Sequence, residues 1–474
     1  MKYQSVIGLE IHAEMLTKSK VFCTCSAEFG GNENSRVCPR CSGLPGTLPV
    51  FNQGAALLAA RAGFALDCKV NNYSAFDRKN YFYPDLPKAY QITQFNYPIC
   101  TDGKIRVGEK DIRINRIHIE EDAGKLVHDD YEGISMADYN RCGVPLIEIV
   151  TEPDIRTAEE ARDFVEQIAL RLKYAGVCDS RMEQGSLRVD VNISLMPYDS
   201  DVFGTRAEIK NLNSLKSIVR AIEYEIERQS EILDKGGRVV QETRRFNDNR
   251  GTTNALRSKE EAHDYRYFPE PDIPPVFLSD EEINAIRESM PEMPQKRFAR
   301  YTDEYGLPEA DAKLLTADKA LSDFYDDAVK IYPSYKNTAN LVLVELLREL
   351  NESGESIGQL KFTPKELAEV VELADKGEIS RNAAKDILNI LFENGGSPHD
   401  IAEEHGFIMN NDTSLLEEIV DKVIEENADS VKSYREGNQK IFGFLMGQVI
   451  KNSGKGANPK LAKETLMRKI EEAE

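Results

Sequence analysis

The stretch Ser186-Leu-Arg-Val-Asp-Val-Asn-Ile-Ser-Leu195 alternates between apolar and polar side chains. Residues two apart on a β-strand point to the same face, so the alternation predicts a strand with one buried and one solvated face. Residues 6–14 (VIGLEIHAE) follow the same pattern and place Glu10 and His12 together on the polar face. The sequence therefore predicts a sheet whose wet face carries titratable side chains.

Helical segments accompany these strands. Residues 157–174 and 214–235 are expected to be helices, and the pattern turns wholly helical after Pro291. We therefore predict an α+β chain of three domains. These are a large β-rich domain over residues 1–291, an all-α domain over 292–405 and a small all-α domain over 406–474.

Capping signals mark helix ends within the second predicted domain. Thr363, the following proline and Glu366 form the pattern of a capping box with proline at the first helical position. A second helix is expected to start at Ser380 and to stop before Gly395. Residues 397–406 are expected to be a turn-rich separator between this bundle and the last helices.

The composition excludes several classes of protein. The chain has 474 residues, 41% hydrophobic and 30% charged, which suits a folded protein rather than a disordered one. No apolar run approaches the ~20 residues of a spanning helix, and Glu10 and His12 stand where a signal peptide would be apolar. We expect a cytoplasmic protein with no membrane contact. The net charge of −21 argues against wholesale wrapping of nucleic acid but permits local basic sites.

Four cysteines crowd together near the N-terminus. Cys23 and Cys25 are followed, after twelve residues, by Cys38 and Cys41. Two short knuckles of this kind supply the four ligands of a closed, structural Zn²⁺ site, and four reduced thiols packed as small apolar groups are the alternative. Core packing is expected for the four isolated cysteines, Cys68, Cys100, Cys142 and Cys178.

Acidic side chains recur in four separate segments. These are Glu10 with His12, the run 118–122, Glu148 and Asp190. Carboxylates with one imidazole suit a hard divalent ion such as Mg²⁺, whereas a solvated surface charge is the favoured interpretation of each carboxylate taken alone. No GxxxxGK[ST] or GxGxxG run is present, so neither common glycine loop binds a nucleotide here.

Cations and aromatic residues interleave in residues 76–95 and again in residues 263–272. Cations contact phosphates and aromatic rings stack on bases, but the same composition also suits aromatic packing with solvated lysines. The positions expected to contact substrate or tRNA are Arg78, Tyr81, Lys88, Tyr90 and Arg266.

A basic window covers residues 432–469, with nine Lys or Arg against two acidic residues. Within it, Lys451, Lys455 and Lys460 surround a Ser, Gly and Asn-rich loop. Such a loop suits contact with an RNA backbone, and a helix end whose cations complement its dipole is the alternative.

Long motifs, in a fixed order, are similar to those of a known family. They are VIGLEIHAEM (6–15), FDRKNYFYPDLPKAYQITQF (76–95), RIHIEEDAGK (116–125), GVPLIEIVTEPD (143–154), EQGSLRVDVNIS (183–194), EIKNLNS (208–214), QETRRF (241–246) and DYRYFPEPD (264–272). Over essentially the whole chain, the sequence resembles the GatB family, the tRNA-handling component of the bacterial aspartyl/glutamyl-tRNA(Asn/Gln) amidotransferases.

The resemblance implies an architecture and an activity. The three predicted domains would be the family's cradle, helical and tail domains, with the tail binding tRNA. The cradle would use ATP to phosphorylate the side-chain carboxylate of Glu-tRNA(Gln) or Asp-tRNA(Asn). Ammonia from a glutaminase partner, the amidase subunit, would then displace the phosphate, as in a carbon–nitrogen ligase. A small third subunit would complete a heterotrimer.

The resemblance also implies site residues. Mg²⁺ would be held by Glu10, His12, Glu121 and Glu148. Asp190, Lys79 and Glu120 are further candidates nearby, and Lys79 and Arg78 could take phosphate charge. Two rival functions remain open at this stage: a tRNA-binding subunit without chemistry of its own, and a metallohydrolase acting on a phosphoester.

Overall fold

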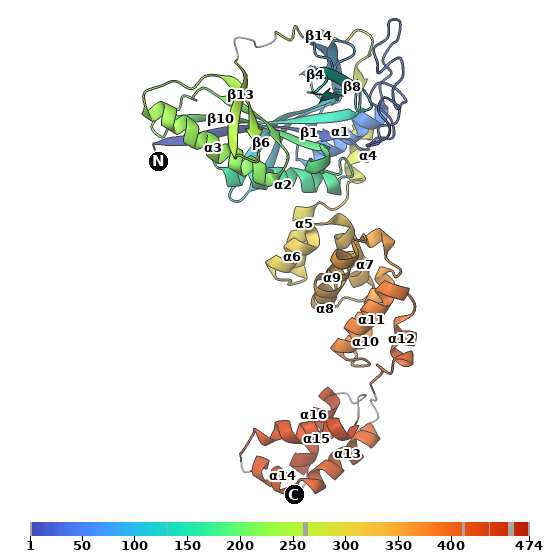
Figure 1. The fold of residues 1–474 in the computed structure, drawn as a ribbon. Helices are drawn as coiled ribbons and strands as arrows, with labels where there is room; N and C mark the ends of the chain where they lie inside the picture. Colours follow the sequence, from blue (N-terminus) through green and yellow to red (C-terminus); the bar gives the residue numbers. More distant parts are fainter. Residues whose placement is uncertain are drawn as a thin grey trace. The chain divides into compact units, whose positions relative to one another are not determined.

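The chain divides into two compact units, one up to Pro294 and the other from Gln295 onward. The computed structural model describes residues 2–129, 131–258, 264–409, 413–435, 437–453 and 459–472. Strands dominate the first unit and helices form the second, as Figure 1 shows, so the predicted α+β class is confirmed.

A nine-stranded sheet forms the centre of the first unit, in the order β13-β12-β11-β10-β1-β9-β6-β5-β2. Its neighbours pair antiparallel except β11 and β12, which are parallel. The strands are β1 (Tyr3–Glu14), β2 (Lys69–Val70), β5 (Cys100–Val107), β6 (Lys110–Glu121), β9 (Pro145–Thr151), β10 (Leu187–Pro197), β11 (Ala207–Leu212), β12 (Glu242–Asn247) and β13 (Thr252–Ser258).

The two predicted strands lie side by side at the middle of this sheet. β1 pairs with β10 along most of its length, from Tyr3 opposite Pro197 to Ala13 opposite Leu187. Ile7, Leu9 and Ile11 are buried, whereas the polar positions between them are partly accessible. The alternation therefore has the face assignment expected from the sequence.

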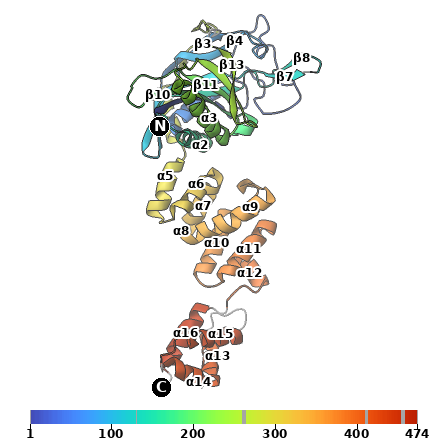
Figure 2. The ribbon, with the colours of Figure 1, turned by 60° about the vertical axis from the view of Figure 1, so that its left-hand side comes forward.

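Helices cover the apolar face of the sheet. α1 (Gln53–Ala65), α2 (Ala158–Tyr174) and α3 (Leu215–Asp234) contribute to one buried cluster with the apolar residues of β1 and β10. Figure 2 shows α2 and α3 side by side beneath the sheet. Thr157 caps α2 by accepting from the Glu160 N–H, and Ser214 caps α3 in the same way. Both helices predicted in this unit are confirmed.

Smaller elements complete the first unit. β3 (Tyr73–Asn80) pairs with β4 (Tyr90–Tyr97), β14 (Phe268–Pro269) and β15 (Val276–Phe277) in a four-stranded sheet. The strands β7 (Lys125–Asp129) and β8 (Ile134–Asp138) form a separate hairpin. α4 (Asp280–Glu288) ends the unit, with Ser279 and Glu282 forming a capping box.

The second unit is a succession of helices. They are α5 (Pro294–Ala299), α6 (Glu309–Thr316), α7 (Lys319–Ile331), α8 (Tyr335–Asn340), α9 (Leu347–Ser353), α10 (Pro364–Asp375), α11 (Arg381–Asn394), α12 (Pro398–Glu404), α13 (Thr413–Glu426), α14 (Ala428–Arg435), α15 (Ile441–Ser453) and α16 (Pro459–Glu472). The capping box of Thr363 and Glu366 is confirmed at the start of α10. Ser380 caps α11, which ends at Gly395 as expected.

One expectation in this unit is wrong. Residues 397–406, predicted to be turns, contain helix α12. Ser397 accepts from the Asp400 N–H and Pro398 occupies the first turn, which is the device that starts α10 as well. A Ser-Pro pair is typical of turns, and here it acts as a helix start.

Two separate apolar clusters lie in the second unit. One spans Tyr301 to Ala402, and Phe407 and Ile408 pack against it. The other spans Leu416 to Ile470. Among the described residues, no helix combines the length and apolar character needed to cross a bilayer.

Candidate active site

A row of titratable side chains crosses the polar face of the main sheet. In the register, His12 of β1 lies opposite Glu148 of β9, which lies opposite His118 of β6. The Nε2 atoms of His12 and His118 lie 3.6 Å and 3.1 Å from Glu148 Oε2. His12 Nε2 also lies 3.4 Å from Glu120 Oε1. The expected convergence of segments 6–14, 118–122 and 145–151 is thus observed.

These neighbours fix the charges in the row. Burial lowers the pKa of His12, but hydrogen bonding to Glu148 and the charges of Glu148 and Glu120 outweigh it and raise the pKa to about 9. Burial raises the pKa of Glu148, but the charge and hydrogen bonds of His118 and His12 bring it below its ordinary value. The raised pKa of His12 and the lowered pKa of Glu148 therefore have one cause, the ion pair between the imidazole and the carboxylate.

His12, Glu120 and Glu148 form a group whose ligand atoms all lie within 4.8 Å of one another. Glu120 Oε2 and His118 Nδ1 are buried and have no hydrogen-bond partner among the described residues. Buried polar atoms are ordinarily paired, so an unpaired carboxylate oxygen beside an imidazole indicates a site that a ligand completes. Two carboxylates and one imidazole are a donor set that fits a hard divalent cation.

A second acidic group adjoins the first on the same face. Glu10, Asp190 and Glu208 also bring their carboxylate oxygens within 4.8 Å of one another. Lys210 Nζ lies 2.5 Å from Asp190 Oδ2 and 2.8 Å from Glu208 Oε1, so one side-chain cation offsets part of the negative charge of this group. Asn192 Nδ2 donates to Glu10 Oε1 at 2.9 Å. Burial and the charge of Glu148 raise the pKa of Glu10.

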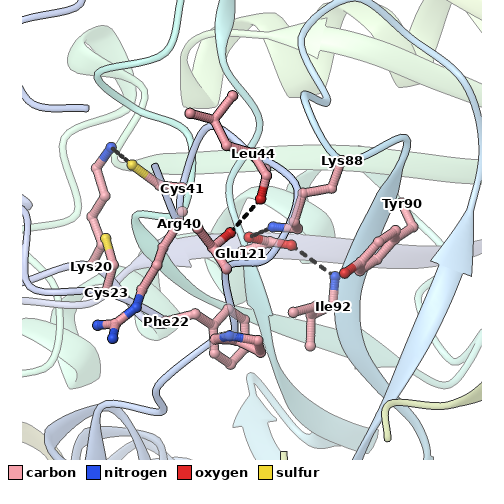
Figure 3. Close-up of a pocket in the computed structure, with 14 residues that line it drawn as sticks. Lys20, Phe22, Cys23, Arg40, Cys41, Leu44, Lys88, Tyr90, Ile92 and Glu121 are labelled. Carbon is pink, nitrogen blue, oxygen red and sulfur yellow. Dashed lines mark hydrogen bonds and ion pairs between the residues drawn. The ribbon is translucent and has the colours of Figure 1, made fainter. Parts of the chain in front are cut away.

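Glu121 lies apart from both groups. Its carboxylate accepts hydrogen bonds from Lys88 Nζ at 2.6 Å and from the Ile92 N–H at 2.9 Å, as Figure 3 shows. This pair stands in the wall of a cavity of about 120 Å³ whose other side includes Lys20, Cys23 and Cys41. The four residues expected to hold Mg²⁺ are therefore distributed over three places, and Glu120 occupies the position expected for Glu121.

The alternation of the strand explains this displacement. Glu120 and Glu121 are consecutive on β6, so their side chains leave opposite faces of the strand. His118 and Glu120, two apart, share the face of His12. The role of Glu121 as a metal ligand remains a prediction that the geometry does not favour.

Lys79 lies beside the first group. Burial lowers its pKa, but the charges of Glu120, Tyr267 and Glu148 outweigh burial and raise it. Its Nζ lies 5.0 Å from the centroid of the Tyr265 ring and 5.8 Å from that of Tyr81. Lys79 thus places an ammonium held by aromatic rings next to the carboxylates.

Arg78 on the same strand is held by carboxylates of its own. Its Nε and Nη2 donate to Glu270 at 2.7 Å and 2.9 Å, and Nη2 also donates to Asp272 at 3.0 Å. Its guanidinium lies 4.4 Å from the centroid of the Tyr90 ring. Arg78 therefore joins β3 to residues 270–272, which leaves little of its charge for a phosphate.

The remaining residues predicted to contact tRNA are Arg266 and three lysines of the basic window. Arg266 is exposed and has φ +45°. Lys451 at the end of α15 and Lys460 at the start of α16 are exposed. Lys455 lies outside the described residues.

The four cysteines of the N-terminal cluster come together. All four Sγ atoms lie within 4.8 Å of one another. The Cys38 and Cys41 Sγ atoms are 3.8 Å apart. That separation matches the sulfur–sulfur edge, about 3.8 Å, of a tetrahedron with Zn–S bonds of ~2.3 Å. A hydrogen bond with Cys23, opposed by burial and assisted by the Lys20 ammonium, lowers the pKa of Cys41 to about 4.

Comparisons with known proteins identify the family of the chain. A family profile described as "GatB/GatE catalytic domain" matches residues 5–284, and one described as "GatB domain" matches residues 323–470. The first of these covers more than half of the chain and contains every residue of both acidic groups. The chain belongs to the GatB family.

Relatives from several bacteria support the assignment along the whole chain. Each is named as the B subunit of aspartyl/glutamyl-tRNA(Asn/Gln) amidotransferase. The GatB protein of Ruminiclostridium cellulolyticum is 54% identical, over 98% of this chain and 97% of the relative. That of Caldicellulosiruptor saccharolyticus is 50% identical over 99% of this chain and all of the relative. The relative from Myxococcus xanthus is 49% identical, over 99% of this chain and 98% of the relative. The resemblance inferred from the motifs is confirmed.

The structure adds residues that the sequence did not assign to the site. His118 belongs to the acidic run 118–122 and has no role on sequence grounds, although its spacing from Glu120 places both on one strand face. Glu208 and Lys210 belong to the motif EIKNLNS and have no predicted role either. Glu208 and Lys210 are two apart on β11, so the sequence could have placed both on one strand face. Only the pairing of β10 with β11 brings them to Asp190.

Proposed function

We propose that the chain is the ATP-dependent activating subunit of a tRNA amidotransferase, a carbon–nitrogen ligase. It phosphorylates the side-chain carboxylate of Glu-tRNA(Gln) or Asp-tRNA(Asn), and ammonia displaces the phosphate to leave the amide. The observation that carries this proposal is the row of His12, Glu148 and His118 with Glu120, on the polar face of the sheet. The names of the relatives support the same substrates.

The site supplies position and charge rather than a base. The attacking carboxylate is ionised at neutral pH and needs no proton removed. Lys79 offers a cation to phosphate oxygens, and Lys210 holds Asp190 and Glu208 in place. His12, Glu120 and Glu148 would hold Mg²⁺, with Glu10 as a neighbouring carboxylate. When bound, Mg²⁺ neutralises charge on the transferred phosphoryl group.

We assign the four-cysteine cluster to a structural Zn²⁺. All four ligand positions are filled by sulfur, so no position is left open for catalysis. Metal analysis of the purified protein tests this assignment directly, and roughly one zinc per chain is expected. A chain that is zinc-free after purification with zinc supplied would leave the cluster as packed thiols.

Partners follow from the proposed reaction. Free ammonia is scarce, so a glutaminase must supply it, and we propose an amidase subunit and a small third subunit as the partners in a heterotrimer. We place tRNA binding in the basic C-terminal segment, which carries Lys451, Lys455 and Lys460. The three domains proposed from the sequence, cradle, helical and tail, serve these tasks in turn.

Replacement of Glu148 by Gln tests the activation step. In the assembled enzyme with ammonium chloride as nitrogen donor, Glu148→Gln should lower ADP release dependent on Glu-tRNA at least about 100-fold, because a bound cation contributes several kcal/mol. Binding of tRNA should be unchanged. Glu152→Gln, the same change outside both acidic groups, is the matched control.

Two other results of this experiment would support the rival functions, a tRNA-binding subunit without chemistry and a metallohydrolase. Amide formation at the normal rate by Glu148→Gln would leave the chain as a tRNA-binding subunit without chemistry. ADP release that is independent of aminoacylated tRNA would indicate the hydrolase instead.

A further inference from the structure

Lys20 is a lysine whose side chain is fully buried, with 0% of its surface exposed. Its Nζ lies 3.7 Å from Cys41 Sγ and donates to the Tyr139 carbonyl at 3.2 Å. Figure 3 shows this ammonium directed at the sulfur. Lys20 therefore contacts the four-cysteine cluster through Cys41.

The backbone holds Lys20 in that position. Its N–H donates to the Cys25 carbonyl at 2.9 Å, and the N–H of Val21 donates to the Gly143 carbonyl at 2.8 Å. These bonds tie Lys20 both to the first knuckle and to the loop that precedes β9. The contact with sulfur is thus built into the fold and is not one of many rotamers of a surface side chain.

No carboxylate in the described part of the chain pairs with the Lys20 ammonium. The Tyr139 carbonyl satisfies one donor but carries no charge. A buried ammonium without an anion is costly, so it is retained where a negative group faces it. Without metal, the cluster offers at most the single charge of the Cys41 thiolate, whereas a divalent ion held by four thiolates carries two net negative charges.

We propose that Lys20 is the counter-cation of a metal tetrathiolate formed by the four cysteines, and that it raises the affinity of the cluster for divalent zinc. The role is that of a positioning residue, because Lys20 contacts a ligand and not the metal. It rests on the proposed zinc site. Lys20 would then support a metal ligand in the way that hydrogen-bonded partners support the ligands of other metal sites.

Substitution of Lys20 by Met tests the role. Lys20→Met removes the charge and keeps an apolar stem, and Lys18→Met makes the same change at an exposed position two residues away. Zinc affinity is measured by competition with a chromophoric chelator on the full chain. We expect Lys20→Met to bind zinc about 10–100-fold more weakly, and Lys18→Met to be unchanged.

Thermal unfolding with and without zinc separates this role from simple packing. Lys20→Met should lower the midpoint more with zinc bound than without it, because the metal-free cluster carries less negative charge beside the ammonium. Equal zinc affinity of Lys20→Met and the unaltered protein would overturn the proposal. An equal loss of stability with and without zinc would assign Lys20 to packing and overturn it as well.

A second variant covers a failure to fold. Lys20→Gln keeps a donor for the Tyr139 carbonyl and lacks the charge, so its zinc affinity should fall as that of Lys20→Met does. Failure of both variants to fold, with or without zinc, would show a structural role and overturn the metal role. An unaltered protein that binds no zinc would instead refute the zinc site itself.

Discussion

Single residues decide which carboxylates meet at the site. Glu120 joins His12 and Glu148, while its neighbour Glu121 turns to Lys88 and the Ile92 N–H. Both are nearly fully buried, with 3% of their surface exposed. Burying a carboxylate costs free energy unless it is paired, and Glu120 and Glu121 pair with different residues, His12 and Lys88.

The ion pair of Lys88 and Glu121 should contribute measurably to the free energy of unfolding. Lys88→Met should lower the free energy of unfolding by about 3–5 kcal/mol, since it strands a buried carboxylate. Lys88→Met combined with Glu121→Gln should recover part of that loss, with a coupling of about 0.5–3 kcal/mol. Calorimetry of the four proteins measures both quantities. Additive losses would show that Glu121 does not depend on Lys88.

At the scale of elements, a buried network joins α3 to the edge of the main sheet. Glu225 has none of its surface exposed and accepts from Arg228 at 3.0 Å and 2.8 Å and from Gln229 at 3.0 Å. Arg244 of β12 lies 3.0 Å from it, and Thr253 of β13 donates to it. One helical carboxylate thus collects partners from two strands.

Glu225→Gln should therefore destabilise the protein by about 3–5 kcal/mol, because it breaks a buried ion pair and leaves Arg228 and Arg244 with Glu242 as their remaining anion. Glu227→Gln, at an exposed position on the same helix, should change stability little. Thermal unfolding of the two variants at neutral pH provides the comparison. Equal midpoints would contradict the importance of the network.

The same carboxylate should confer a dependence on pH. Burial raises the pKa of Glu225, but hydrogen bonds from Arg228, Thr253 and Gln229 outweigh it and hold the pKa below its ordinary value of 4.5. Its stabilisation is complete above pH 4.5 and is lost as the pH falls through the lower folded-state pKa. The stability difference between Glu225→Gln and the unaltered protein should shrink over that acidic range, as measured by unfolding at several pH values.

Loss of a helix cap should lower the free energy of unfolding by a smaller amount, and the capping residues can be recognised in the sequence alone. Thr363→Ala removes the side chain that caps α10 and should cost about 1 kcal/mol, whereas Thr363→Ser should retain the capping box. Denaturant unfolding of the second unit distinguishes the two. A full loss in Thr363→Ser would show that the methyl group and not the cap is responsible.

For the whole molecule, the helical part contains two apolar clusters and not one. Phe407 and Ile408 pack with the cluster that ends at Ala402, and the Met409 N–H donates to the Glu378 carbonyl. We therefore move the start of the proposed tail from residue 406 to a point after Met409. A truncation there preserves the contacts of the preceding helices.

Truncation after Met409 should weaken binding of tRNA roughly tenfold or more, because it removes the basic window of residues 432–469. Assembly with the partner proteins and the unfolding midpoint of the first unit should be unchanged. Filter binding and size-exclusion chromatography measure tRNA affinity and assembly. Undiminished tRNA affinity would refute the role given to the tail.

Salt should weaken that binding, with a slope set by the number of cations in the tail that contact phosphates. Of the nine cations in the basic window, Arg468 and Lys469 pair with acidic residues of α13, and Arg435 donates to the Ile470 carbonyl. Surface contacts of this kind can exchange for phosphates, so the nine cations together set the upper bound on the slope of log affinity against log salt, about 8 in magnitude. A slope that requires many more contacts would show that tRNA meets a larger basic surface.

The sequence by itself determined the elements and the family. Alternation, capping residues and cysteine spacing are local properties, and they correctly predicted the central strands, α2, α3, α10, α11 and the meeting of four thiols. Only the tertiary structure decided which carboxylates share a site. Strand order and register, set by burial of the opposite face, bring Glu148 between His12 and His118 and send Glu121 elsewhere. The burial of Lys20 behind Cys41 is likewise a contact between distant positions, which no local pattern contains.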